Sequence, residues 1–402
     1  METQLIDSFY DKFDDKFKKR IDKVVKLIVD AKNSEQKVSV VTGSGPNIHE
    51  GVTTLIAELI NKGIIDGVLT SSAVIAHEMG GALDKVKRVK ADLLDFEERD
   101  VWLPKGDIFE LTQLTAAQWE EIGAEMDLDK DLIEKLEAMD GKTIIKAAGN
   151  MAYPMGLRTE LLAEEILKMG TKKFNRQYSL EYLAGLGADD RTMIGAGARN
   201  NVPVLVSIPQ LVGGGAVGLS IGDSISIHDR CHRNAKILGE SSVIIESGLA
   251  LAQEVHDGPY ETYTGHGIWA QWNDEYVYSL KGKNLIRFDL DVNLEKVWQQ
   301  QRNSGMVQQA IADGKPKTKV TGVPFRMEMS GFARLESSVP VVGDLGEIWP
   351  IVAHRVSEAL GIDLEFMSYK QETGAGQKMR EWIVDNVHYI KNDKLMEAID
   401  RL

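Results

Sequence analysis

Two polar turns near the start of the chain carry residue types suited to holding a ligand. The first turn, residues 44–51, follows a β-branched run at 38–41, and the second, residues 70–78, follows a run at 67–70. Such runs predict buried parallel strands, and ligands collect where these strands end because free N–H groups at helix starts favour phosphates. We therefore expect a nucleotide there, with these candidate cofactor-binding residues: Ser44, Gly45, Asn47, Thr70, Ser71, Ser72 and Glu78.

Neither turn carries a standard phosphate fingerprint. The segment SGPNIHEG is not GxGxxG, and it lacks the lysine and hydroxyl of GxxxxGK followed by Ser or Thr. Helix capping by Asn47 and by residues 70–72 is therefore an open alternative. On the helix after the second turn, Glu78 suits hydrogen bonds from a ribose, and His77 is a candidate substrate contact.

A later loop, residues 257–269, combines acids, hydroxyl groups and a histidine between glycines. Asp257, Glu261 and His266 are candidate catalytic residues, because a histidine beside acids suits general acid or base work. Trp269 is a candidate wall of a substrate pocket. The alternative is a structured crossover in which the aromatic side chain packs in the core.

Histidines also support a rival interpretation, a metal-dependent hydrolase or lyase. The segment HDRCH places His228, Cys231 and His232 at helical spacing on one face, and His256 adds a further possible ligand. The motif is neither HExxH nor a paired CxxC. A structural helix with hydrogen-bonded histidines and a buried cysteine is the alternative, so the favoured interpretation contains no metal.

The hydrophobic pattern divides the chain into three regions. Residues 1–36 are predicted to form N-terminal amphipathic helices, and residues 37–265 a nucleotide-binding α/β domain with a helical insertion at 84–140. Strands predicted at 142–147, 202–207 and 241–247 imply that the sheet is doubly wound. Residues 266–402 are predicted to be an α+β region, either a second domain or an antiparallel extension of the sheet, because alternation around the KGKN turn suits antiparallel strands.

Composition narrows the class of protein further. The 402 residues carry a net charge of -14 and one cysteine. A polyanion partner held by bulk charge is disfavoured, and no internal disulfide can form. No apolar run reaches the length of a membrane span. We expect a cytoplasmic protein that binds a small-molecule substrate, without nucleic acid or membrane partners.

Three segments together resemble the deoxyhypusine synthase family. They are GVTTLIAELINKGIIDGVLTSS at 51–72, NNVPVLVSIPQLVGGGAVG at 200–218 and QEVHDG at 253–258. The resemblance covers roughly residues 38–270. It implies a deoxyhypusine-synthase-like, Rossmann-type parallel sheet, NAD as the cofactor, amine or alkyl group transfer through NAD-linked oxidation, and a homo-oligomer.

The chain departs from that family at the nucleophile. In the family a lysine follows Trp-Gly, whereas the comparable stretch here is GHGIWAQW at 265–272, and Val212 and Gly213 replace the aspartate of a Thr-Asp-Gly loop. We therefore expect a small-molecule enzyme related to deoxyhypusine synthase, with NAD or a similar nucleotide. Its reaction is expected to be a group transfer or redox-linked step on an amine-type metabolite. A non-catalytic nucleotide or metabolite sensor is the third alternative.

Overall fold

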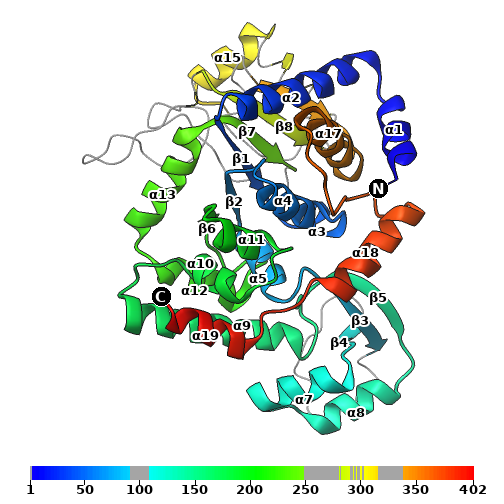
Figure 1. The fold of residues 1–402 in the computed structure, drawn as a ribbon, viewed down its shortest axis with the longest axis vertical. Coiled ribbons are helices and arrows are strands. Elements are labelled where there is room, and N and C mark those ends of the chain that lie inside the picture. The colour runs from blue at the N-terminus through cyan, green and yellow to red at the C-terminus, as the bar shows by residue number, and fades with distance from the viewer. Residues whose placement is uncertain are drawn as a thin grey trace.

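The computed structural model describes residues 2–90, 108–248 and 338–402. Between the last two ranges it describes residues 280, 282–289, 293, 296, 299–300 and 303–315. Helices and strands in these ranges build a parallel sheet flanked by helices and a smaller antiparallel sheet at one end (Figure 1).

The central sheet has six parallel strands in the order β6-β2-β1-β7-β8-β9. Most of their side chains are apolar, often β-branched, and buried, as is typical of strands covered on both faces. The strands are β1 (Lys37–Thr42), β2 (Gly67–Ser71), β6 (Val204–Ile208), β7 (Ser241–Ser247), β8 (Asn284–Asp289) and β9 (Ser338–Val342). The predicted α/β class with a Rossmann-type parallel sheet is confirmed.

Helices cover both faces of this sheet, and side chains alternate between two apolar clusters. Val40 and Ile245 belong to the large cluster that includes helices α2, α4 and α17, whereas Val41 and Ile244 pack with α13 on the other face. These helices are α2 (Asp15–Asn33), α4 (Val52–Asn61), α17 (Leu345–Leu360) and α13 (Ile227–Glu240).

The remaining helices connect the strands or pack at the ends of the sheet. They are α1 (Thr3–Asp11), α3 (Pro46–His49), α5 (Ser72–Met79), α9 (Met155–Phe174), α10 (Leu180–Gly187), α11 (Met193–Asn200), α12 (Gly215–Ser224), α15 (Gly305–Ala312), α18 (Gly374–Asn386) and α19 (Asn392–Asp400). Helices α1 and α2 confirm the amphipathic pattern at the N-terminus, and their buried residues include Phe9 and Ile21. No helix in the described ranges is long and apolar enough to cross a lipid bilayer.

The insertion is less helical than its charged sequence indicates. It contains β3 (Leu83–Lys90) and β4 (Ile108–Thr112), which form an antiparallel sheet with β5 (Lys142–Ala147), and two helices, α7 (Ala116–Glu125) and α8 (Lys130–Ala138). The prediction that 142–147 resumes the parallel sheet was therefore wrong. Val86 and Val89 of β3 are buried, but the lysines and the arginine around them make the segment look like a charged helix in the sequence.

The expectation of antiparallel strands around the KGKN turn was also wrong. Strand β8 pairs in parallel with β7, and β9 pairs in parallel with β8. Alternation within a segment indicates a strand but not the direction of its partner. Residues 268–279 of the predicted strands lie outside the described residues, and the division into a separate region at 266–402 stays a prediction.

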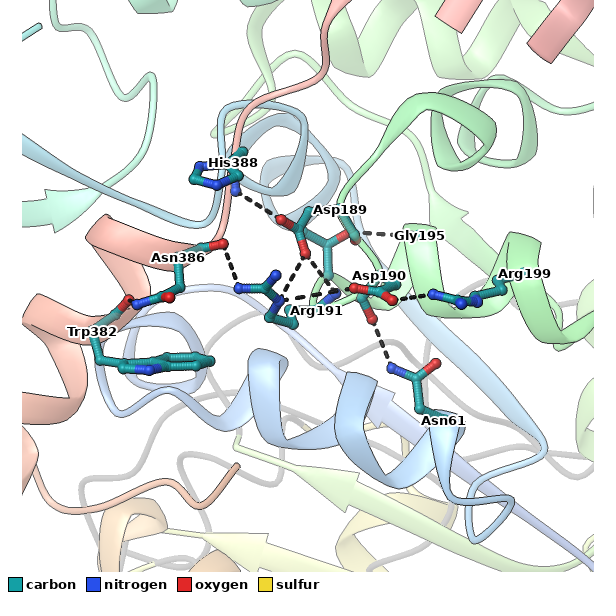
Figure 2. Close-up of polar contacts among 10 residues, drawn as sticks. Asn61, Asp189, Asp190, Arg191, Gly195, Arg199, Trp382, Asn386 and His388 are labelled. Carbon is teal, nitrogen blue, oxygen red and sulfur yellow. Dashed lines mark hydrogen bonds and ion pairs between the residues drawn. The ribbon is translucent and has the colours of Figure 1, made fainter. Parts of the chain in front are cut away.

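The loop between α10 and α11 joins three parts of the fold (Figure 2). The Asp189 carboxylate accepts hydrogen bonds from the backbone N–H of Arg191 at 3.0 Å and from that of His388 at 3.2 Å. Arg191 in turn donates to the backbone oxygen of Asn386, at the end of α18, at 2.6 Å. The backbone oxygen of Asp190 accepts from Asn61 of α4 at 2.8 Å. The loop therefore fastens the C-terminal segment to the core.

Replacing Asp189 with alanine is expected to lower the free energy of unfolding by about 2–3 kcal/mol, because it leaves N–H groups without their acceptor. Asp189 keeps 7% of its side-chain surface exposed, whereas its neighbour Asp190 keeps 40% and pairs with Arg199. The matched control Asp190→Ala is expected to cost less than about 1 kcal/mol. Urea denaturation measures both, and equal losses would contradict the assignment.

Candidate functional site

The order of the strands places a reversal point between β1 and β7. The chain leaves β1 through α4 to reach β2 on one side, while β7 lies on the other side of β1. Ligands of open α/β sheets bind outside the carboxyl ends of the strands at such a point. The turns after β1 and β2 lie side by side here, because these strands pair in parallel from Ser39↔Gly67 to Val41↔Leu69.

The turn after β1 is open at its tip. Ser44 is half-buried and Gly45 is exposed. Gly45 has φ of 70° and ψ of -120°, and no atom lies within 4 Å of the position that a Cβ would occupy. A ligand can therefore approach the backbone closely at Gly45.

Asn47 is buried and fixes this turn to the end of β7. Its side-chain amide donates to the backbone oxygen of Ser247 at 3.1 Å, and the Ser247 hydroxyl donates to Asn47 Oδ1 at 2.6 Å. The Trp349 indole N–H donates to the same hydroxyl at 2.8 Å. Helix α4 has Gly51 as its N-cap, so Asn47 does not cap it. Asn47 thus joins the two strands of the reversal point.

The hydroxyl residues after β2 are largely used within the protein. Ser71 caps α5 by accepting the backbone N–H of Val74 at 3.4 Å, as the capping interpretation predicts. Ser72 donates to the backbone oxygen of Gln210 at 3.1 Å. The buried Thr70 hydroxyl has no hydrogen-bond partner among the described residues. Of these three side chains, Thr70 is the one whose hydroxyl group is unpaired among the described residues.

Glu78 has a structural role instead of the predicted ribose contact. Its two carboxylate oxygens accept the backbone N–H groups of Met193 and Ile194 at 2.8 Å and 3.1 Å, at the start of α11. Burial raises the pKa of Glu78 to about 8, although these two hydrogen bonds oppose the shift. Both oxygens are engaged, so Glu78 ties α5 to α11.

His77 lies where α5 meets the small sheet. Its Nδ1 is 2.7 Å from the backbone oxygen of Ala148, which can only accept, so Nδ1 carries the proton. Burial lowers the pKa of His77 below its usual value. The imidazole is therefore neutral at pH 7, and Nε2 holds a free lone pair.

Three further basic side chains lie near His77, and together we call the four the basic group: His49, His77, Lys146 and Arg380. Lys146 forms an ion pair with Glu110 and donates to the backbone oxygen of Asn150 at 2.8 Å. Arg380 donates to the backbone oxygen of Ile145 at 2.5 Å. Burial, followed by the charges of Arg380, His77 and Lys146, lowers the pKa of His49 to about 4. Sequence reasoning missed Lys146 and Arg380, because neither belongs to a motif.

An acidic group adjoins the basic one: Glu50, Asp344 and Glu372. Their carboxylate oxygens lie within 4.8 Å of one another, and within the described ranges no other histidine, cysteine or acidic residues form such a group. Glu50 accepts the backbone N–H of Gln371 at 2.6 Å. Asp344 already pairs with Lys370 at 3.1 Å. One of the three carboxylates is therefore already neutralised by a lysine ammonium.

The other predicted site residues fall into two sets. His228 and His232 lie on α13 with Cys231, and they are not part of a three-ligand group in the described residues. The second set lies outside the described residues, and its roles stay predictions: His256, Asp257, Glu261, His266 and Trp269.

Glu50 is expected to make stability depend on pH. Burial raises its pKa to about 7, so the folded state binds the proton more tightly than the unfolded state does. Its contribution is full below the unfolded pKa near 4.5 and is lost as the pH rises through 7. Glu50→Gln cannot ionise, so its stability relative to the wild type should rise between pH 5 and pH 8 in urea titrations. The exposed Glu164→Gln is the control, and parallel curves for Glu50→Gln and the wild type would refute the prediction.

Comparison with known proteins gives remote structural similarity. No protein-family profile and no curated protein matches the chain. A putative deoxyhypusine synthase from Entamoeba histolytica is similar over 88% of this chain and 92% of its own, with 8% identity and a TM-score of 0.41. ArgZ, an arginine dihydrolase from the ornithine-ammonia cycle in cyanobacteria, is similar over 84% of this chain, with 11% identity and a TM-score of 0.37.

AgrE, in a ternary complex with ornithine and NAD+, is similar over 84% of this chain with 11% identity and a TM-score of 0.36. The chain spans about a third of the length of ArgZ and AgrE, 31% and 32% respectively. At these identities and TM-scores the likeness is too remote to transfer an activity or a site residue. The fold class therefore rests on the sheet topology described above.

Proposed function

We propose that the chain is a small-molecule enzyme that binds NAD or a related nucleotide at the carboxyl edge of its parallel sheet. In this proposal it acts on an amine-type metabolite by a group transfer or redox-linked step. A bound nicotinamide would supply a hydride acceptor. The observation that carries the proposal is the open turn at Gly45 beside the reversal point between β1 and β7.

The fit to a nucleotide is good at the tip of the first turn. Gly45 offers backbone without an overlying side chain, and the Thr70 hydroxyl is buried without a partner in the described ranges. Four other predicted contacts have structural roles at this edge of the sheet, because their side chains form hydrogen bonds within the protein: Asn47, Ser71, Ser72 and Glu78. Ser44, Gly45 and Thr70 are therefore the proposed nucleotide contacts in this part of the chain.

His77 is the proposed general base. The hydrogen bond from Nδ1 to Ala148 fixes the ring, and its lowered pKa keeps Nε2 unprotonated at neutral pH. A fixed neutral imidazole can take a proton from a substrate amine or carbon during oxidation or transfer. His266, Asp257 and Glu261 stay predicted partners in this chemistry.

Nucleotide binding is expected to raise thermal stability. At a hundredfold excess over Kd, NAD+ or NADH should add about 2.7 kcal/mol of stabilisation. Gly45→Asp should abolish this increase, because it places a negative side chain where phosphates approach, and the strain that a positive φ imposes on a side chain is shared with the control variant.

Gly63→Asp is the matched control. Gly63 also has φ of +70° and no atom within 4 Å of a Cβ position, but it follows α4, away from the turn at Gly45. Its melting shift with NAD+ should equal that of the wild type. No shift with any nucleotide would sink the proposal, and metal-induced shifts instead would favour the hydrolase or lyase alternative. A shift without any turnover would favour the sensor.

A further inference from the structure

The basic group is built around one short segment of backbone. Arg380 donates to Ile145, His77 to Ala148 and Lys146 to Asn150, all at backbone oxygens of the segment from the end of β5. His49 belongs to α3, directly after the open turn. Four elements separated in sequence thus bring basic side chains together near the end of β5.

The positive charges of this group are incompletely balanced. Lys146 pairs with Glu110. Arg380 has no carboxylate oxygen within 4.0 Å among the described residues, and the charges of Glu50 and Glu372 act on it from a longer distance. The buried Nε of Arg380 has no hydrogen-bond partner among the described residues. A guanidinium in this state favours a planar anion that accepts two parallel hydrogen bonds.

The histidines are suited to the same occupant. Both have lowered pKa values, for which burial is the first cause and neighbouring positive charge a further one. An anion bound among them would offset that positive charge and raise both pKa values. The neutral His49 can donate its ring N–H to such an anion, whereas the Nδ1–H of His77 is already engaged with Ala148.

We propose that His49, Lys146 and Arg380, which lie beside His77, bind the carboxylate of the substrate, so that the substrate is an amino acid rather than a polyamine. This inference rests on the proposed function for the presence of a substrate beside the nucleotide. The adjoining carboxylates of Glu50 and Glu372 complement the amine of the same molecule. A polyamine, which carries only positive charge, is repelled by the basic group.

Paired ligands that differ only in the carboxylate test the inference. L-Lysine and its decarboxylated form, cadaverine, are titrated into the full chain by calorimetry, with and without NAD+. We expect L-lysine to bind about 10- to 100-fold more tightly, the range for a hydrogen-bonded charged pair. Binding of L-lysine should also raise the pKa of His49 and His77 in NMR titrations. Equal affinities, or tighter binding of cadaverine, would overturn the inference.

Arg380→Met removes the charge but keeps the length of the side chain. It should lower the affinity for L-lysine by about 10- to 100-fold and leave the melting shift with NAD+ unchanged. Arg199→Met, at a side chain that is 67% exposed, is the control and should change neither. If Arg380→Met fails to fold, His49→Asn serves instead, and an unchanged affinity for L-lysine in the folded variant overturns the inference.

Inorganic phosphate distinguishes the source of the anion. Competition of phosphate with NAD+, together with loss of the NAD+ shift in Arg380→Met, would assign the basic group to nucleotide phosphates and overturn the carboxylate assignment. Failure of the proposed function looks different. In that case no nucleotide shifts the melting temperature of any variant, while the comparison of L-lysine with cadaverine is still decided without NAD+.

Discussion

Replacing Glu181 with leucine is expected to lower the free energy of unfolding by about 3–5 kcal/mol, because it strands a buried arginine without its counter-ion. Glu181 of α10 has no exposed side-chain surface, and Arg230 of α13 has 6%. Glu181 Oε1 accepts from Arg230 at 2.7 Å and from the backbone N–H of Val206 in β6 at 2.8 Å. The pair therefore holds two helices to the edge strand of the parallel sheet.

Further hydrogen bonds of Arg230 explain why replacing Glu181 alone is expected to lower stability so much. Arg230 also donates to the backbone oxygens of Val206 and Ile221 at 2.8 Å and 2.7 Å. These bonds keep the guanidinium in place after its acid is gone, so its charge stays buried. The double variant Glu181→Leu with Arg230→Met should recover part of the loss, because it removes the unpaired buried charge but leaves the backbone groups of Val206 and Ile221 without these partners.

Urea denaturation at pH 7 measures both variants. Glu164→Leu is the control, since Glu164 forms an exposed pair with Lys168, and it should cost less than about 1 kcal/mol. A loss below about 1 kcal/mol for Glu181→Leu, or no recovery in the double variant, would show that the buried pair does not hold these helices.

Replacing His77 with glutamine is expected to reduce kcat by about 10²- to 10⁴-fold while leaving the fold intact, because it removes the proposed general base. Glutamine can still donate a hydrogen bond to the Ala148 oxygen, so the link to the small sheet is kept. The substrate for the assay is identified by mass spectrometry of ligands carried through native purification. Nucleotide-induced melting shifts should equal those of the wild type.

The pH profile supplies a second readout for His77. Its pKa is lowered in the unliganded enzyme, so the wild-type kcat/KM, which reports the free enzyme, should form a plateau that extends below pH 6.5. His388→Gln is the control, since the His388 side chain is exposed and its contact with Asp189 uses backbone N–H. Unchanged kcat in His77→Gln would exclude it as the base.

The parallel core could be predicted from the sequence because its strands have a distinct hydrophobic pattern. The central positions of the predicted strands, such as 40–41, 204–206 and 243–245, are all apolar, as is typical of a strand buried on both faces. The turns at 44–51 and 70–78 were placed at one edge for the same reason. Their detailed roles were not accessible, since Asn47 and Glu78 look the same in sequence whether they face a ligand or the backbone of a distant segment.

The small sheet and the basic group could not be predicted, for a different reason. In strand β3 the buried Val86 and Val89 are three residues apart among lysines and an arginine, a spacing that a charged helix also shows. Arg380 lies near the end of β5 because α18 packs beside the small sheet. Its hydrogen bond to Ile145 joins residues 235 positions apart. Pairing of distant segments follows from topology, which one sequence does not reveal.

The hydrogen bond from the Trp349 indole to the Ser247 hydroxyl links residues 37–248 to the C-terminal residues 338–402. Residues 37–248 contain the turns and the strands of the reversal point, but the indole that holds Ser247 and the guanidinium of Arg380 both come from residues 338–402. A fragment that ends before α17 would expose Phe288, which packs edge-on against Trp349 at 5.1 Å. The part of the chain that carries the proposed nucleotide site is therefore not a transferable module, because truncation that separates it from the C-terminal helices removes contacts that hold it together.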